Sequence, residues 1–384
     1  MSQKAVISGA YDTAVGRVEG STAMGLLTEA GRGAMRNAGL KPADIDGVLA
    51  AYTIPEHHLM LSSWLAEYLG IQPSFSANVS AGGASGCIMV MNAAALIEAG
   101  VCRHVLCITG DNRLTGMSRD AAVATLAKVG HAEFEVPYGI NVPASYALVA
   151  QRYMHDYGTT SEQMAAIAVT TRRHAGRNPK AQMREPITID DVLNSRMIAS
   201  PLHLLDCCVV SDGAAAILVS AADAAPDLAA KPITILGTGQ QHTHEHILAA
   251  PSLSEFGCHY SSQRAFAAAG LGPQDIDVAE IYDSFTITLV IELESIGFFG
   301  RGEAGQAALE GALELDGALP CNTHGGLLSY AHSGAAGGMF HVVEAVRQLR
   351  GEADARQVPG AEIGFVHGDG GILSAHCSLV LGRS

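Results

Sequence analysis

The sequence has few charged residues, and basic residues are the scarcer kind. Charged residues make up 16% of the 384 positions, and 23 Lys and Arg against 38 Asp and Glu give a net charge of −15. A nucleic-acid-binding protein needs a basic stripe, so this balance excludes nucleic acid as a partner. Hydrophobic residues reach 48%, which excludes a disordered chain. The longest uncharged stretch, 71–97, is interrupted by Ser, Asn, Pro and Gly, so no membrane span is expected.

The cysteines lack the spacing of a metal or disulfide framework. There are eight, with no C-x-x-C pair and no zinc-ribbon spacing, so they are expected to be reduced thiols in the cytoplasm. The N-terminal residues MSQKAVISGAYD contain no apolar segment of signal-peptide length. The 43 glycines follow no fixed period, which excludes collagen-like and solenoid folds. These absences predict a soluble, acidic, cytoplasmic protein.

One segment occurs twice. Residues 39–46 read GLKPADID and residues 270–277 read GLGPQDID. Each follows an alanine-rich stretch of helical pattern and precedes a short apolar run, at 48–52 and 278–282. The pattern predicts a helix ended by glycine, a proline-bearing turn and then a strand, present once in each half of the chain.

A second correspondence supports a duplication. Gly82-Gly83 precedes a predicted helix at 85–99 and a strand at 103–110, and Gly325-Gly326 precedes a helix at 339–350 and a strand at 362–367. We therefore predict an α/β protein with mixed, mostly parallel sheets and two similar halves, 1–230 and 231–384. Residues 111–200 match neither copy and are predicted to form an inserted, partly helical region.

Glycines accompany the residues that could carry chemistry. The run 78–86 would place backbone N–H groups at a helix N-terminus, where an oxyanion is stabilised, although close helix packing explains the same glycines. Segments 280–285, 322–338 and 367–371 each place a histidine or tyrosine beside glycines at a strand–helix junction. Such junctions bind ligands in α/β sheets, and both side chains are suited to proton transfer.

In order and spacing these segments resemble the thiolase superfamily, particularly sterol-carrier-type thiolases and thiolase-like lipid-transfer proteins. The resemblance runs nearly end to end through five segments: 82–86, 211–216, 282–285, 322–338 and 367–371. It implies a duplicated five-layered α-β-α-β-α fold with an inserted loop region. It also implies action on a coenzyme A thioester, no tightly bound cofactor, and a homodimer or homotetramer.

The departures from the thiolase pattern concern the two reactive thiols. Gly83 stands where a thiolase has its nucleophilic cysteine, and His367 stands where the second catalytic cysteine would be. Tyr282 replaces the usual first residue of its motif, whereas His332 matches the thiolase histidine. We therefore expect carbon–carbon bond making or breaking on an acyl-CoA without a cysteine acyl-enzyme. Cys87, one helical turn beyond Gly83, is expected to point into the core.

The catalytic residues expected from this resemblance are Tyr282, His332, His367 and Asp369. The backbone N–H groups of Gly83 and Gly371 would stabilise the oxyanion. The residues expected to bind substrate are Ser85, Asn322, His324, Arg172 and Arg173. The two arginines begin a run of five basic residues within 172–184, which could meet the phosphates of coenzyme A or form a solvated helix face.

Two alternative functions remain at this stage. Some thiolase-like proteins resemble aldolases that use a tyrosine at the Tyr282 position and work with an OB-fold or zinc-ribbon partner protein. The other alternative is a non-catalytic lipid or acyl-CoA carrier. The run His242-Thr-His-Glu-His246 could hold a metal on one face of a strand, but it reads better as a solvated loop, so no metal is expected.

Overall fold

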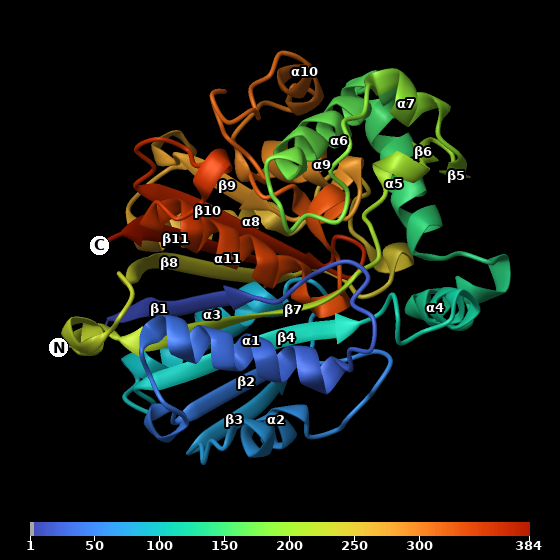
Figure 1. The fold of residues 1–384 in the computed structure, drawn as a ribbon. Coiled ribbons are helices and arrows are strands. Elements are labelled where there is room, and N and C mark those ends of the chain that lie inside the picture. The colour runs from blue at the N-terminus through green and yellow to red at the C-terminus, as the bar shows by residue number, and fades with distance from the viewer. Residues whose placement is uncertain (1–3) are drawn as a thin grey trace.

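A mixed sheet forms the centre of the molecule. In the computed structural model, which describes residues 4–384, nine strands have the order β3-β2-β4-β7-β1-β8-β11-β10-β9 (Figure 1). The strands are β1 (Ala5–Asp12), β2 (Gly47–Ala51), β3 (Phe75–Val79), β4 (His104–Asn112), β7 (Asp212–Ala221), β8 (Ile233–His242), β9 (Val278–Ile281), β10 (Ile363–Gly370) and β11 (Ala375–Arg383). Strands before residue 230 fill one end of this order and strands after it fill the other.

Helices cover the sheet in three layers. They are α1 (Ala23–Ala38), α2 (Leu61–Leu69), α3 (Ser85–Glu98), α8 (Cys258–Ala269), α9 (Thr286–Ile296) and α11 (Gly337–Arg350). Helices α1 and α2 share one apolar core with the N-terminal strands, and α8 and α9 share another with the C-terminal strands. Helices α3 and α11 lie between, in a core that takes residues from both sets of strands. This is the expected five-layered α-β-α-β-α arrangement.

The expectation of mostly parallel strands is wrong. Three strand pairs are parallel (β2–β3, β2–β4 and β9–β10), whereas the other five pairs of the nine-stranded sheet in residues 4–384 are antiparallel. Parallel strands need a crossover connection, and in this sheet those crossovers run through helices. Strand β10 instead returns through a short turn to β11, and β4 pairs with β7, which follows the insertion.

The repeated segment has the same local structure in both halves. Gly39 ends α1 with φ +76° and Gly270 ends α8 with φ +68°, values that a residue with a Cβ rarely adopts. A 3₁₀ turn follows in each copy. Asp46 then accepts hydrogen bonds from the backbone of Arg103 and His104, and Asp277 does so from Glu362 and Ile363. The predicted correspondence is therefore present in the structure.

The inserted region, predicted at about residues 111–200, lies between β4 and β7, over residues 113–211. Its elements are α4 (Arg119–Leu126), α5 (Val142–Tyr157), α6 (Ser161–Gly176), α7 (Ile189–Asn194) and the short strands β5 (Met197–Ala199) and β6 (Leu202–His203). Helix α6 packs on α9 and on α10 (Ala304–Leu309). The insertion therefore lies over the part of the molecule that is built from the C-terminal half of the chain (Figure 1). Within residues 4–384, no helix combines the length and apolarity needed to cross a bilayer.

Candidate active site

A tyrosine and a histidine from the C-terminal half form a hydrogen-bonded pair. Tyr282 follows β9, and its hydroxyl lies 3.0 Å from Nε2 of His332. The backbone N–H of His332 donates to the hydroxyl of Ser211, and His332 accepts through its carbonyl from the Ser211 N–H, which fixes its loop. Burial raises the pKa of Tyr282 well above its ordinary value and lowers that of His332 to about 3. Both groups are therefore neutral at pH 7.

The Tyr282 ring fills the space beside Gly83. A Cβ built on Gly83 would lie 2.2 Å from the Tyr282 hydroxyl and from two ring carbons. Gly337, at the start of α11, is also close, since a Cβ there would be 2.8 Å from the ring. A side chain at position 83 would thus collide with the phenol. The tyrosine hydroxyl stands where the superfamily resemblance places a thiol.

The two glycine segments expected to supply oxyanion donors lie against each other. A Cβ on Gly82 would be 2.8 Å from the backbone nitrogen of Gly371 and 2.7 Å from the α-carbon of Gly370. Gly82 and Gly371 have φ +56° and +73°, so this close approach of two turns needs glycine on both sides. The turn before α3 and the turn after β10 therefore form one backbone-lined edge beside Gly83.

The structure adds two residues that sequence reasoning missed. Sγ of Cys208 lies 3.5 Å from Nδ1 of His332, and burial raises the pKa of this thiol to about 12. Arg113, directly after β4, is buried, and its positive charge contributes to the lowered pKa of His332. The position of Arg113 at the end of a strand was a usable signal. No feature of the sequence pointed to Cys208, because its contact with His332 joins two segments that only tertiary packing brings together.

His367 does not join Tyr282 and His332, contrary to expectation. Side chains alternate between the two faces of a strand, so His367 shares the face of Phe365, with which its ring stacks. That face packs on α8 and α9, whereas Val366 faces the central core with α3 and α11. Only the His367 carbonyl reaches the site, accepting from the backbone N–H of Tyr282.

Asp369 lies on the same outer face as His367. Its Oδ2 accepts a hydrogen bond of 3.0 Å from the hydroxyl of Tyr146, which also contacts the carbonyl of Gly371. Burial raises the pKa of Asp369 well above its ordinary value. The carboxyl group therefore favours its protonated form, and Tyr146 ties it to the turn that carries Gly371.

Asn322 and His324 are buried, and the Asn322 amide is hydrogen-bonded within the chain, whereas His324 pairs with Glu280 and its Nε2 has no hydrogen-bond partner among the described residues. The Asn322 amide bonds both backbone groups of Ile281, at 2.7 and 2.8 Å, and so holds the end of β9. Nδ1 of His324 lies 2.9 Å from Oε2 of Glu280. The Glu280 pKa is lowered to about 2, with burial opposing the shift and the His324 charge driving it, and the His324 pKa is raised in turn. This arrangement is a buried ion pair.

Ser85 and Cys87 are likewise internal. The Ser85 hydroxyl donates to the carbonyl of Gly82 and accepts from the N–H of Ala81, so it shapes the turn. The Cys87 side chain is fully buried in the central core, as expected, and burial raises its pKa to about 12. Neither side chain offers a free group to a substrate in this arrangement.

The two predicted phosphate-binding arginines lie on α6 and differ in exposure. Arg172 is buried, and its guanidinium donates to the Ser329 hydroxyl and the Glu185 carbonyl. A phosphate could reach it only if these bonds broke. Arg173 is half-exposed and paired with Glu314. Of the two, only Arg173 presents its charge to solvent.

The histidine run at 242–246 does not form a metal site. Nε2 of His244 contacts the Ile372 carbonyl, and the ring of His246 packs on His131. Among the described residues, two other buried groups have three side chains at ligand distance from one another: Glu280, His324 and His341, and Glu292, His367 and His376.

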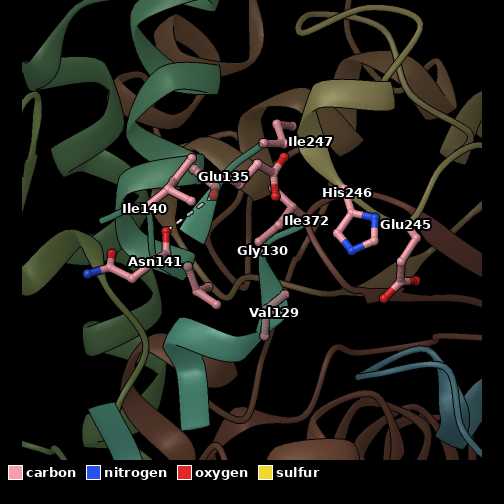
Figure 2. Close-up of a pocket in the computed structure, with 11 residues that line it drawn as sticks. Val129, Gly130, Glu135, Ile140, Asn141, Glu245, His246, Ile247 and Ile372 are labelled. Carbon is pink, nitrogen blue, oxygen red and sulfur yellow. Dashed lines mark hydrogen bonds between the residues drawn. The ribbon is translucent and has the colours of Figure 1, made fainter. Parts of the chain in front are cut away.

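A small pocket lies where the insertion meets the C-terminal half. Figure 2 shows Val129, Gly130 and Glu135 of the insertion facing Glu245 and His246. The Glu135 carboxylate accepts from the backbone N–H groups of Leu248 and His131, which ties both walls together. None of the predicted catalytic side chains lines this pocket, so it is a packing seam beside the site.

Comparison with known proteins identifies two domain families in this chain. The N-terminal domain of thiolase matches residues 5–223, and the thiolase C-terminal domain-like family matches residues 239–383.

The similar proteins catalyse different reactions. An acetyl-CoA acetyltransferase of Methanothermobacter thermautotrophicus is 36% identical over 91% of this chain and 93% of its own length. A 17-hydroxy-3-oxo-4-pregnene-20-carboxyl-CoA lyase of Mycobacterium tuberculosis is 36% identical over the full length of both chains. The solved structure of an Ltp2-ChsH2(DUF35) aldolase superposes with a TM-score of 0.88 at 35% identity, covering 99% of this chain and 98% of that one.

Proposed function

The chain belongs to the thiolase superfamily, and from this premise we propose that it makes or breaks a carbon–carbon bond on an acyl-CoA thioester by aldol chemistry, without an acyl-enzyme. It is a thiolase-like enzyme, since its relatives over nearly the whole length are acyltransferases and lyases of this kind. Among these reactions, the aldol direction is favoured by the residues beside Gly83.

The observation that carries the proposal is the Tyr282 ring beside Gly83. An acyl-enzyme needs a nucleophile at the start of α3, and the phenol occupies the space that such a side chain would need. A retro-aldol cleavage needs no nucleophile. It needs a group that takes the proton of a β-hydroxyl and donors that stabilise the thioester enolate.

The Tyr282–His332 pair can perform the proton transfer. The substrate hydroxyl gives its proton to the Tyr282 oxygen while the phenol proton moves over 3.0 Å to Nε2 of His332. The carbon–carbon bond then breaks, releasing a ketone or aldehyde and leaving the enolate of the shortened acyl-CoA. The proton returns by the same route to the α-carbon. Burial disfavours the intermediate imidazolium, so the backbone N–H groups near Gly83 and Gly371 must stabilise the enolate that balances it.

A partner protein and a second copy of the chain belong to the same proposal. The similar aldolase structure is named as a complex with a DUF35 protein, which supports an OB-fold or zinc-ribbon partner here. The large apolar side chains exposed on the insertion and beside it include Phe134, Tyr138, Leu148 and Leu248, which could be covered by such a partner. We further propose a homodimer, a cytoplasmic location and coenzyme A phosphates near Arg173.

Turnover and covalent labelling test the proposal together. The purified chain, alone and with a co-encoded DUF35 protein, is incubated with a β-hydroxyacyl-CoA, and release of the carbonyl product and the shortened acyl-CoA is followed by mass spectrometry. We expect cleavage with no acyl adduct in the intact mass. A stoichiometric adduct on Cys87, Cys208 or another residue would contradict the mechanism. Tight binding without turnover in both samples would instead identify a carrier.

A further inference from the structure

A second group of buried polar side chains lies on the outer face of β10 and β11, beneath α8 and α9. His367 and His376 come from the two strands, and Glu292 comes from α9. All three side chains are completely buried. They lie on the opposite face of the sheet from the Tyr282–His332 pair, so the proposed reaction does not use them.

The hydrogen-bond partners of His376 fix which of its nitrogens carries the proton. Nε2 of His376 lies 2.9 Å from the carbonyl oxygen of Leu373. A carbonyl can only accept, so this nitrogen must be the N–H donor. In the neutral imidazole, Nδ1 of His376 is then a bare lone pair, and it faces His367.

A chain of hydroxyl groups gives the same answer for His367. The Ser261 hydroxyl is 3.0 Å from the Cys258 carbonyl and 3.0 Å from the Ser378 hydroxyl, which is 2.9 Å from Nδ1 of His367. Each hydroxyl has one proton. All three contacts are satisfied together only when Ser261 donates to the carbonyl, Ser378 donates to Ser261, and Nδ1–H of His367 donates to Ser378. Nε2 of His367 is then also a bare lone pair.

The two lone pairs face each other, and unpaired carboxylate oxygens surround them. Nε2 of His367 and Nδ1 of His376 are 3.2 Å apart. Oε1 of Glu292 lies 3.7 Å from the first, and Oδ1 of Asp369 lies 3.8 Å from the second. Within residues 4–384, neither Glu292 oxygen nor this Asp369 oxygen has a hydrogen-bond partner. Three side chains, Glu292, His367 and His376, thus converge on one buried point with Asp369 beside His376, and a cation at that point would satisfy their lone pairs.

We propose that Glu292, His367 and His376 bind one divalent transition-metal ion, with Zn²⁺ as the preferred species, and that Asp369 lies beside this site. Zn–N and Zn–O bonds of about 2.0–2.1 Å place neighbouring tetrahedral ligands roughly 3.3 Å apart, close to the separations of 3.2 and 3.7 Å between these side chains. Two imidazoles and one carboxylate suit a first-row ion, and Glu292 would lose its proton when the ion binds. The Leu373 carbonyl and Ser378 hydroxyl would be the outer groups that orient both rings.

The position of the ion indicates a supporting role. It would join α9 to β10 and β11 just before the turn that carries Gly371, and His367 accepts the backbone N–H of Tyr282. The ion would therefore hold the backbone on which the proposed site is built without touching the reacting atoms. This departs from the expectation, drawn from the sequence, of no metal.

Metal content provides the test, and because the site is buried the ion must be present while the chain folds. The full chain is expressed in minimal medium supplemented in turn with Zn²⁺, Mn²⁺, Fe²⁺ or Co²⁺, purified without chelator, and measured by inductively coupled plasma mass spectrometry. We expect about one equivalent per chain from the Zn²⁺ or Co²⁺ cultures. The Co²⁺ protein should show visible d–d absorption of a low-symmetry N/O site.

Variants on one helix separate this site from other metal sites. Glu292→Gln and, as a second disruption, His376→Asn should lower the bound metal at least about tenfold. Glu294→Gln is the matched control, because Glu294 is also a buried carboxylate of α9 but bonds Tyr153 and the N–H groups of Gly302 and Ala304. It should keep the full equivalent.

Three results would overturn the proposal. The first is less than about 0.1 equivalent in wild-type protein from every culture, which would mean that a proton joins the two imidazoles. The second is equal metal in the wild type and the folded Glu292 or His376 variants. The third is thiolate charge-transfer absorption in the Co²⁺ protein, which would place the ion at a cysteine. The wild-type measurements decide the question even when a variant fails to fold.

Discussion

Two buried histidine–carboxylate clusters lie on opposite faces of the C-terminal part of the sheet, one at β9 and one at β10 and β11, and differ in how their charges are satisfied. In the inner cluster, Glu280 accepts from the N–H and hydroxyl of Thr323 and pairs with His324. In the outer cluster, Glu292 has no hydrogen-bond partner among the described residues, although two imidazoles are close. The inner carboxylate has a pKa of about 2, while burial raises the pKa of the outer one well above its ordinary value.

The difference shows that residue type and burial do not define a site by themselves. In the inner cluster the Glu280 carboxylate already meets His324 and two donors of Thr323, although Nε2 of His324 and Nε2 of His341 have no hydrogen-bond partner among the described residues. In the outer cluster two imidazole lone pairs and the unpartnered Glu292 carboxyl face the centre, and a bound cation would satisfy all three. The Leu373 carbonyl accepts the N–H of His376, and the Ser378 hydroxyl accepts the N–H of His367. Both N–H groups therefore point away from the centre of the cluster, and the imidazole lone pairs point towards it.

The largest expected effect comes from breaking the inner ion pair. Glu280→Gln leaves His324 charged and unpaired in the interior, so the free energy of unfolding should fall by about 3–5 kcal/mol. Urea unfolding at pH 6 measures it. Glu362→Gln is the control, because this residue is exposed at the start of β10 and should change stability by less than about 0.5 kcal/mol. A fall of less than about 1 kcal/mol for Glu280→Gln would mean that the inner cluster is not an ion pair.

The next largest effect is expected on catalysis, from a change to the proposed proton-transfer residue Tyr282. Tyr282→Phe removes the hydroxyl that contacts His332 and should lower kcat for carbon–carbon cleavage by about 10²-fold or more, with the fold retained. Steady-state rates and circular dichroism check both parts. The variant should bind as much metal as the wild type. Full activity in Tyr282→Phe would remove Tyr282 from the mechanism.

The inner pair should also give stability a defined pH dependence. The Glu280 pKa is lowered from 4.5 to about 2, so its contribution is present above pH 4.5 and is lost as pH falls towards 2. The His324 pKa is raised from 6.5, so its contribution is complete below pH 6.5 and is lost as pH rises through the folded value. The stability difference between wild type and Glu280→Gln should therefore be greatest between pH 4.5 and 6.5. A difference that does not vary with pH would contradict this.

A smaller effect is expected from adding one carbon beside the phenol. Gly83→Ala places a Cβ 2.2 Å from the Tyr282 ring, so the ring must move, at a cost of about 1–3 kcal/mol in stability and with a loss of cleavage activity. Gly83→Cys should show the same loss and gain no thiolysis. Gly100→Ala is a suitable control for adding a methyl group, since nothing lies near its Cβ, although its φ of +72° adds strain. Acyl transfer by Gly83→Cys would contradict the blocked position.

The smallest effect on stability is expected from breaking the Arg173–Glu314 ion pair, which is more exposed than the buried Glu280–His324 pair. Arg173→Ala breaks an ion pair with Glu314 on the surface of α6 and should change the free energy of unfolding by less than about 1 kcal/mol, because water screens it. Chemical denaturation measures this, and KM for the acyl-CoA is measured in the same samples. We expect KM to rise severalfold from the lost phosphate contact. An unchanged KM would leave Arg173 as a purely structural residue.

Much of the fold could be predicted from the sequence because its signals are local. The GLKPADID and GLGPQDID segments specify a glycine helix end, a 3₁₀ turn and a strand, and both copies form them. The ordered glycine, tyrosine and histidine segments identified the superfamily, and the missing thiols at positions 83 and 367 were visible in the sequence itself. Tyr282 and His332 could be paired because each was placed by its own motif.

The remaining features depended on which face of a strand each side chain occupies and what covers it. His367 resembles an active-site residue by its place in the chain. It is two residues after Phe365 in β10, however, so its side chain lies on the same outer face of the strand as the Phe365 ring. Asn322 and His324 stand in the expected block, yet the Asn322 amide bonds the end of β9 and His324 pairs with Glu280. The strand directions, the Cys208–His332 contact and the outer cluster around Glu292 join residues distant in sequence. The sequence by itself determined the local turns, the duplicated pattern and the lost thiols, because each depends on neighbouring residues. Only the tertiary structure decided which polar groups face a reacting site, which close on each other and which remain unpaired, because burial and partners are set by packing between distant segments.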